Sequence, residues 1–435
     1  MRRRTVLAVL VMLVGAMAFL AAGCGGEEEE AAAPPPAAET GVAPAEPTPP
    51  AEPPPAEAVT LKIVSDLPLQ GSDRPQTAQM NAAIQFYLNQ IGFQAGPYTI
   101  EFEAFDDSTA AAGKWDEATC ASNARTYAED ESIVGVMGTY NSGCAAIIIP
   151  ILNEAGLAMV SPANTYAGLT HSAPGTEAGE PDKYYPSGSR NYTRVVASDD
   201  FQGAVGAKFM KETLGVTKVF ILDDKELYGK GVADAFEGFA EEFGLEVVGH
   251  EGYDVAASNY KALMTKIKDL GADGIYIGGI STNNGGQVIK DKVEVVGDNE
   301  AVKLVVTDGY VLSTLFEEAG IDNLEGAYGT APTQPPEKLT GAGKEFLDAF
   351  LAENPGIAEV YTIYAAAAVQ ALTDAIARSD GTRADIIAKL FETNLADGVP
   401  GPIAFDENGD PRAKVESIYH ATGGAWEWQE TVVVE

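Results

Sequence analysis

Residues 132–165 read SIVGVMGTYNSGCAAIIIPILNEAGLAMVSPANT, and this stretch indicates the fold of the chain. Residues 132–137 form an apolar run of strand length, residues 144–155 have the length and composition of a helix, and residues 158–160 form a second short apolar run. A strand, a helix and a strand in this order predict a right-handed βαβ unit on a parallel sheet.

The same alternation recurs along the rest of the chain. Ahead of the quoted stretch we expect strands at 61–64 and 98–105 and helices at 76–90 and 116–129. A second series begins after Val195, with strands expected at 218–222, 246–249, 274–278 and 302–306 and helices at 201–214, 231–243, 260–270 and 287–295. Two such series predict an α/β protein with two doubly wound, Rossmann-like lobes.

The length of the chain indicates the number of domains, and its net charge excludes two classes of partner. Residues 59–435 are 377 residues (435 − 58), which is too many for one hydrophobic core, so we expect two domains. The chain has 28 basic and 64 acidic residues, a formal net charge of −36. Nucleic acid and anionic lipid surfaces would be repelled by this charge, so neither is an expected partner.

The first 58 residues read as an export signal and a spacer. Three arginines precede an apolar run over residues 5–22, and Leu20-Ala21-Ala22-Gly23-Cys24 resembles the lipobox of bacterial lipoproteins. This resemblance implies a signal peptide at 1–23 and a lipid on Cys24, while a retained membrane helix is the alternative. Residues 24–58 are rich in Ala, Pro and Glu and lack apolar periodicity, which predicts a disordered tether.

Two further cysteines, Cys120 and Cys144, flank the strand expected at 132–137. An even pair in an exported protein favours a disulfide, and two buried free thiols are the alternative. Closing a loop of this length would contribute on the order of 3 kcal/mol.

Polar clusters follow the predicted strands. In open α/β sheets a ligand sits beyond the carboxyl ends of the strands, so these clusters predict a ligand site between the lobes. Five clusters share this position: residues 141–143, 163–165, 227–229, 279–281 and 308–310.

Several short segments resemble the branched-chain amino acid-binding proteins of ABC importers, which have the type I periplasmic-binding fold. The matching segments are 105–107, 138–143, 161–165, 224–229, 276–279 and 401–410. This resemblance implies two lobes joined by three hinge crossings. We therefore expect residues 59–195 plus 332–405 to form lobe 1 and residues 196–331 plus 406–435 to form lobe 2.

The resemblance also implies roles for residues of the first lobe. Ser142, between Asn141 and Gly143, matches the serine that binds a ligand carboxylate through its hydroxyl and backbone amide. A helix start offers free N–H groups to an anion, although Ser142 or Asn141 acting only as an N-cap is the alternative. Thr165 matches a second carboxylate contact, and Ala163 matches a carbonyl that accepts from the ligand ammonium.

Three residues of the second lobe complete the implied site. Tyr228 matches a tyrosine that closes over the ligand, with a core aromatic as the alternative. Asp308 stands where the family has a glutamate for the ligand ammonium. Ile280 stands where leucine-type binders have a tyrosine, which puts a branched-chain ligand in doubt.

Together these features predict an extracytoplasmic lipoprotein, anchored to the bacterial cell membrane, that captures an amino acid and delivers it to an ABC permease with a cytosolic ATPase. A membrane-tethered sensor of the same fold is the alternative, and amides, urea-like molecules and small aromatic acids are alternative ligands. His171, His250 and His420 lack metal-ligand spacing, and no nucleophile motif is present. We therefore expect no enzyme activity, no metal and no cofactor.

Overall fold

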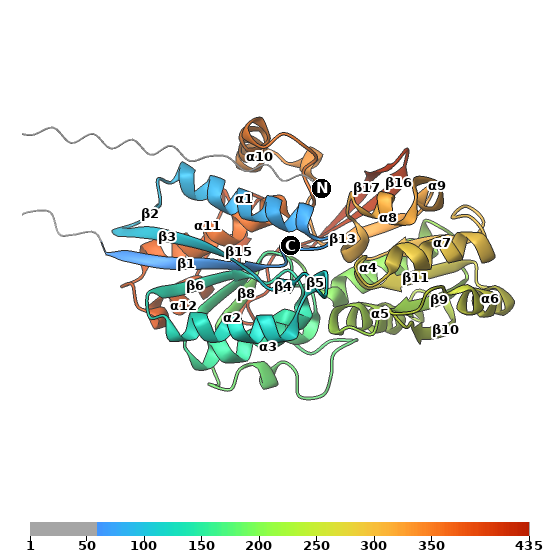
Figure 1. The fold of residues 1–435 in the computed structure, drawn as a ribbon, viewed down its shortest axis with the longest axis horizontal. Helices are drawn as coiled ribbons and strands as arrows, with labels where there is room; N and C mark the ends of the chain where they lie inside the picture. Colours follow the sequence, from blue (N-terminus) through green and yellow to red (C-terminus); the bar gives the residue numbers. More distant parts are fainter. Residues whose placement is uncertain (1–58, 435) are drawn as a thin grey trace, which may run out of the picture. The chain divides into compact units, whose positions relative to one another are not determined.

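The computed structural model describes residues 59–434, which belong to one compact unit (Figure 1). This unit contains a six-stranded and a seven-stranded sheet, so the predicted α/β class is confirmed. The predicted signal peptide, Cys24 and the tether at 24–58 lie outside the described residues.

The six-stranded sheet is the centre of the first lobe. Its strands run in the order β2 (Gln94–Ala95), β3 (Tyr98–Asp106), β1 (Thr60–Leu67), β6 (Ile133–Gly138), β7 (Ala158–Ser161) and β8 (Tyr192–Arg194). All neighbours pair in parallel except β2 and β3. One face packs against α1 (Arg74–Gln90) and α11 (Thr362–Arg378), and the other against α2 (Glu117–Glu129) and α3 (Ser142–Glu154) (Figure 1). The helices α10 (Gly341–Glu353) and α12 (Arg383–Phe391) also belong to this lobe.

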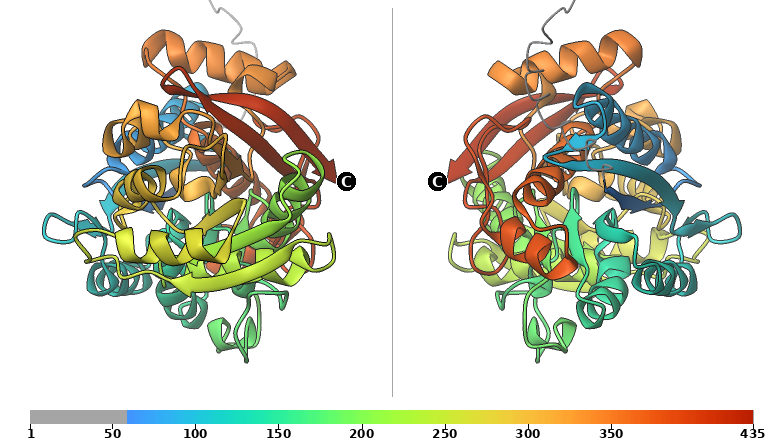
Figure 2. Two further views of the ribbon diagram at one scale, coloured as in Figure 1. Left: turned by 90° about the vertical axis from the view of Figure 1, so that its right-hand side faces the viewer. Right: turned by 90° about the vertical axis from the view of Figure 1, so that its left-hand side faces the viewer.

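The seven-stranded sheet is the centre of the second lobe. Its order is β10 (Glu246–Gly252), β9 (Lys218–Asp223), β11 (Gly274–Gly278), β12 (Lys303–Val306), β13 (Tyr328–Ala331), β16 (Lys414–Thr422) and β17 (Ala425–Val434). The last two strands are antiparallel and form the long hairpin seen in Figure 2. One face packs against α4 (Asp199–Glu212) and α5 (Leu227–Ala240), and the other against α6 (Lys261–Leu270), α7 (Gly285–Val295), α8 (Leu315–Ala319) and α9 (Ile321–Leu324).

Short elements complete the fold. The hairpin β4 (Ser108–Thr109) and β5 (Lys114–Trp115) follows β3, and β14 (Asn394–Leu395) pairs with β15 (Ile403–Ala404). Four 3-10 turns lie at Ala167–Leu169, Asp182–Tyr184, Asp308–Tyr310 and Pro336–Lys338. Within residues 59–434, no helix combines the length and apolarity that a membrane crossing requires.

Several helices start earlier than predicted, and in two of them the difference matters for the site. The helix expected from residue 144 begins at Ser142, and the helix expected from residue 231 begins at Leu227. Asn141 and Glu226 have extended backbones at the N-cap positions, so the helices start directly after them. Glycines in both first turns lowered the apparent helix propensity. Ser142 and Tyr228 are therefore held in helical turns instead of loops.

The chain passes between the two sheets three times, after β8, after β13 and after β15, which is the number of crossings that the family resemblance implied. The exact lobe boundaries expected at residues 195, 331 and 405 stay predictions. A fully buried ion pair joins the first and third crossings, because Arg194 Nε donates to Asp410 Oδ1 over 2.6 Å. Arg194 also donates to the carbonyl of Tyr166 over 2.9 Å.

The structure places the sulfur atoms of Cys120 and Cys144 2.01 Å apart, which is the distance of a disulfide bond. Their Cα atoms are 5.7 Å apart, and both side chains are fully buried between α2 and α3. The pair therefore joins the two helices that cover one face of the first sheet.

The buried pair at the crossings predicts a large stability effect. Asp410→Ala is expected to lower the free energy of unfolding by about 3–5 kcal/mol, because it leaves the Arg194 guanidinium buried without its counter-ion. Urea unfolding followed by circular dichroism measures this loss. Glu212→Ala is the control, since its pair with Lys208 is exposed and should change stability by less than about 1 kcal/mol. Equal effects of the two substitutions would contradict the role given to the buried pair.

Candidate functional site

A small cavity lies between the lobes, where the carboxyl ends of strands from both sheets meet. Its volume is about 20 Å³, and it is lined by Tyr140, Asn141, Ser142, Ala163, Thr165, Tyr228, Ile280, Asp308 and Gly309. Seven of the eight ligand-binding residues expected from the sequence are among them, so the structure brings these together. Their role in binding stays a prediction. The eighth, Gly143, does not line the cavity.

The first turn of α3 brings backbone N–H groups to the cavity. The N–H groups of a first helical turn have no partner within the helix, and the positive end of the helix dipole favours an anion. Ser142 lies in this turn and is 2 % exposed. Its hydroxyl accepts from the N–H of Tyr166 over 3.3 Å. The side chain of Asn141 makes no hydrogen bond to the first turn of α3. Asn141 contributes only its extended backbone, which sets the start of the helix. The arrangement is suited to a carboxylate.

The loop after β7 is fixed by its own polar groups. The hydroxyl of Ser161 accepts from the N–H of Ala163 over 3.1 Å and of Asn164 over 2.8 Å. The side-chain amide of Asn164 donates to the carbonyl of Tyr140 over 3.1 Å, which ties this loop to the loop before α3. Thr165 is 1 % exposed, and its carbonyl accepts from the N–H of Asp199. Hydrogen bonds within the protein therefore hold both Ser142 and Thr165, the two residues expected to contact a carboxylate from the first lobe.

Asp308 faces the cavity from the second lobe, and both of its carboxylate oxygens already have donors. Tyr228 donates its hydroxyl to Oδ1, and Tyr361 donates its hydroxyl to Oδ2 over 2.7 Å. Burial raises the pKa of Asp308, although the hydrogen bonds from Tyr228 and Tyr361 oppose that shift. The carboxylate expected to meet a ligand ammonium is thus shared by two tyrosines in this arrangement.

Tyr361 and Tyr140 are site residues that the sequence did not indicate. Tyr361 directly precedes α11 in the first lobe, so its bond to Asp308 crosses between the lobes. Its ring meets that of Tyr140 edge to face, with centroids 5.9 Å apart. Tyr140 directly precedes Asn141, which the sequence analysis expected at the ligand site. This position next to Asn141 was the one feature of the sequence that could have indicated Tyr140. Tyr361 follows no predicted strand, and 53 residues separate it from Asp308, so no local pattern could have found it.

Trp115, at the end of the β4–β5 hairpin, covers the start of α3 and was also missed. A Cβ added to Gly143 would lie 2.6 Å from the Trp115 ring, so a glycine is needed for this close approach. The indole N–H donates to Glu226 Oε2 of the second lobe over 3.2 Å. Lys114 pairs with the same carboxylate and donates to Asn283 Oδ1 over 2.6 Å. The hairpin therefore contributes three side-chain contacts between the lobes.

Within residues 59–434, two groups of side chains come close enough together to share a metal ion. One is Asp107 with Cys120 and Cys144, and the other is Asp234, Glu237 and His250. The two sulfurs of the first group bond each other, which removes the thiolates a metal would need. His250 lies 2.8 Å from Glu237 and 3.2 Å from Asp223, and these acids raise its pKa against the effect of burial. Neither group lines the cavity.

Comparison with known proteins agrees with this architecture. The periplasmic binding protein family matches residues 60–419. The Leu/Ile/Val-binding protein BraC3 of Rhizobium johnstonii is 27% identical over 387 residues, which are 87% of this chain and 94% of that protein. The crystal structure of a leucine binding protein, LivK, from Thermotoga maritima superposes with a TM-score of 0.74 at 22% identity and covers 86% of this chain and 98% of that chain. A solute binding protein of an ABC transporter from R. palustris, in complex with benzoate, gives a TM-score of 0.71 at 18% identity, covering 86% and 97%.

The chain belongs to the periplasmic binding protein family, since the match spans most of its length. It is accordingly a binding protein rather than an enzyme, and its two lobes have the type I periplasmic-binding fold. The family resemblance seen in the sequence is confirmed.

Proposed function

We propose that the protein captures a small carboxylate-bearing solute, an amino acid, in the cavity between its lobes. The observation that carries this proposal is the first turn of α3, with Ser142 beside the cavity and Thr165 on the neighbouring loop. N–H groups and hydroxyls converging on one small space suit a carboxylate. BraC3 and LivK, named for Leu/Ile/Val and leucine binding, support an amino acid.

A carboxylic acid without an amine is the second candidate, and Asp308 is the observation that favours it. An ammonium group would have to compete with the Tyr228 and Tyr361 hydroxyls for the Asp308 oxygens. A ligand such as benzoate, which the R. palustris protein binds, needs no such exchange. The tyrosine rings and Ile280 would then pack against an apolar body.

Ligand entry requires the lobes to separate. A cavity of about 20 Å³ has room for about one water molecule, and its lining side chains are at least nine-tenths buried. Opening would break the Tyr361–Asp308 and Trp115–Glu226 bonds, which both join the two lobes. A solute that contacts both lobes would favour their closure, since only a difference in affinity can shift such an equilibrium.

We also propose that Cys24 carries a lipid, that residues 24–58 tether the lobes to the membrane, and that the closed form delivers its solute to an ABC permease with a cytosolic ATPase. Formation of the Cys120–Cys144 bond after export belongs to the same proposal. A sensor that signals through a membrane partner remains the alternative, and permease and ATPase genes beside this one would favour transport.

The carboxylate site predicts a selective loss of affinity. Thermal-shift titrations of the purified protein with leucine and with benzoate should raise the melting temperature for the true ligand class. Ser142→Ala should weaken that ligand by about tenfold, because one hydrogen bond to a charged group is lost. Ser132→Ala, in an exposed turn, is the matched control. Failure of all amino acids and aromatic acids to shift the melting temperature would reject the proposed function.

Substitution of Asp308 distinguishes the two candidate ligands, an amino acid and a carboxylic acid without an amine. Asp308→Asn should weaken an amino-bearing ligand by at least about tenfold, because a buried charge pair is lost, and should leave benzoate unchanged. Isothermal titration calorimetry measures both, with the exposed Asp322→Asn as the charge control. An equal loss for ligands with and without an amine would contradict the ammonium role.

The proposed anchor predicts a labelling result. A bacterium fed an alkyne-bearing fatty acid should incorporate the label into the wild-type protein and not into Cys24→Ala. The variant should also leave the membrane fraction. Continued membrane retention of unlabelled Cys24→Ala would instead support an uncleaved helix at residues 5–22.

A further inference from the structure

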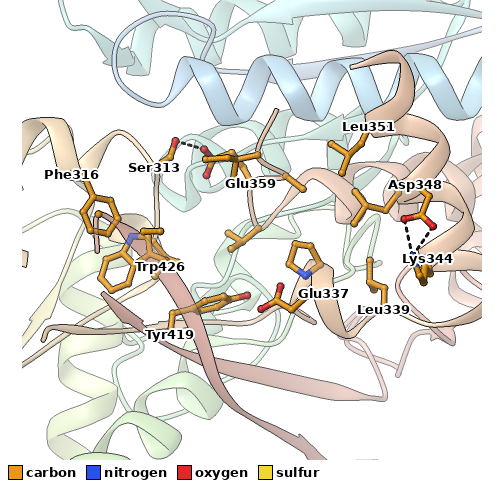
Figure 3. A pocket seen from close by; sticks show the side chains of 18 residues that line it. Ser313, Phe316, Glu337, Leu339, Lys344, Asp348, Leu351, Glu359, Tyr419 and Trp426 are labelled. Carbon is orange, nitrogen blue, oxygen red and sulfur yellow. Dashed lines mark hydrogen bonds and ion pairs between the residues drawn. The ribbon is translucent and has the colours of Figure 1, made fainter. Parts of the chain in front are cut away.

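A second and larger cavity, of about 460 Å³, lies apart from the Asp308 site and shares no lining residue with it (Figure 3). One wall comes from the first lobe, from α10 and the segment 357–360. The other comes from the second lobe, from the segment 311–316 and the β16–β17 hairpin. Its volume falls within the roughly 300–1,000 Å³ typical of small-molecule sites.

The walls are mostly apolar and include aromatic faces. Leu339 and Leu351 lie on the α10 side in Figure 3, and Leu347, on α10, lines the same cavity. Phe316 and Trp426 face them, with ring centroids 5.6 Å apart at an interplanar angle of 61°. Such walls suit an apolar body about the size of one aromatic ring with a short chain.

The charged groups of this cavity are predominantly negative. Glu337, Asp348 and Glu359 are opposed by Lys344 alone. Lys344 Nζ lies 2.6 Å from Asp348 Oδ2, so the charges of these two residues balance each other. The carboxylates of Glu337 and Glu359 then have no further cation among the lining residues. An anionic ligand would therefore be repelled, whereas a cation would be attracted.

Glu359 is the group placed to hold a charged ligand. It is 9 % exposed, and the hydroxyl of Ser313, from the other lobe, donates to its Oε1. A carboxylate can accept about four hydrogen bonds, so capacity for an ammonium remains. Burial raises the pKa of Glu359, and a bound cation would oppose that shift.

We propose that this cavity is a second ligand site, which takes an apolar organic amine with its ammonium on Glu359 and its apolar body against Trp426 and Leu347. The aromatic walls attract a cation as well as an apolar group. The first cavity is lined by Ser142 and Thr165, whereas this cavity is lined by the Glu359 carboxylate, so the two sites differ in the charge that they select.

This second site is coupled to lobe closure. Its walls come from both lobes, and the Ser313–Glu359 bond crosses between them. An occupant that contacts both walls stabilises the closed arrangement and, by linkage, raises affinity at the Asp308 cavity. This coupling rests on the proposed function, whereas amine binding itself does not.

Calorimetric titration of the purified protein with phenethylamine and with its neutral analogue 2-phenylethanol tests the proposal. The wild type should bind the amine more tightly than the alcohol. Glu359→Gln should weaken the amine by at least about tenfold and leave the alcohol unchanged, because only the charged hydrogen bond is removed. Glu353→Gln is the matched control, since Glu353 is exposed on α10 and does not line the cavity.

Two further variants separate this site from the first. Ser142→Ala should keep amine binding, even if the proposed function fails, because the Ser142 hydroxyl accepts from Tyr166 within the first lobe. Leu351→Arg should abolish it by placing a cation in the cavity, with folding checked by circular dichroism. The proposal is overturned if no heat of binding appears at millimolar amine, if Glu359→Gln binds the amine as the wild type does, or if Ser142→Ala removes binding.

Discussion

The carboxylate of Asp308 is the interaction on which the closed arrangement depends. A buried carboxylate is costly unless donors surround it, and here one tyrosine from each lobe supplies a hydroxyl. Tyr228 fixes Asp308 within the second lobe, and Tyr361 reaches it from the first. The hydrogen bond that satisfies a buried charge is therefore also a bond between the lobes.

Two other buried acids, Asp199 and Glu416, repel the Asp308 carboxylate and make its charged form less favourable. Asp199 and Glu416 are at most 1 % exposed, and burial, together with repulsion by Asp308, raises the pKa of each. Three carboxylates so close together cannot all ionise cheaply. The buried carboxylate of Asp410, at the crossings, is instead stabilised in its charged form. The Arg194 guanidinium and His171 hold the pKa of Asp410 below its usual range. The interior thus contains acids whose charged form is disfavoured by burial as well as an ion-paired acid, within a chain that is strongly acidic overall.

The sequence predicted the fold because its signals are local. Apolar runs of strand length alternate with helices, and polar residues end the strands, so four strands of each sheet and most of the cavity lining could be inferred from neighbouring residues. The clusters that contain Ser142, Thr165, Tyr228 and Asp308 were found in this way, and the family resemblance then singled out these four residues. The sequence could not show that Tyr361 would satisfy Asp308, or that Trp115 would cover Gly143, because those contacts join distant segments and depend on packing. It also could not show the second cavity, whose walls come from segments without any motif.

The β4–β5 hairpin gives the protein a built-in optical probe. Trp115 touches the start of α3 on one side and Glu226 of the opposite lobe on the other. Parting of the lobes would expose its indole ring to solvent and change its emission, while Trp426 and Trp428 lie elsewhere, on β17. Once those two tryptophans are replaced, the molecule would report its own opening and closing without any attached dye.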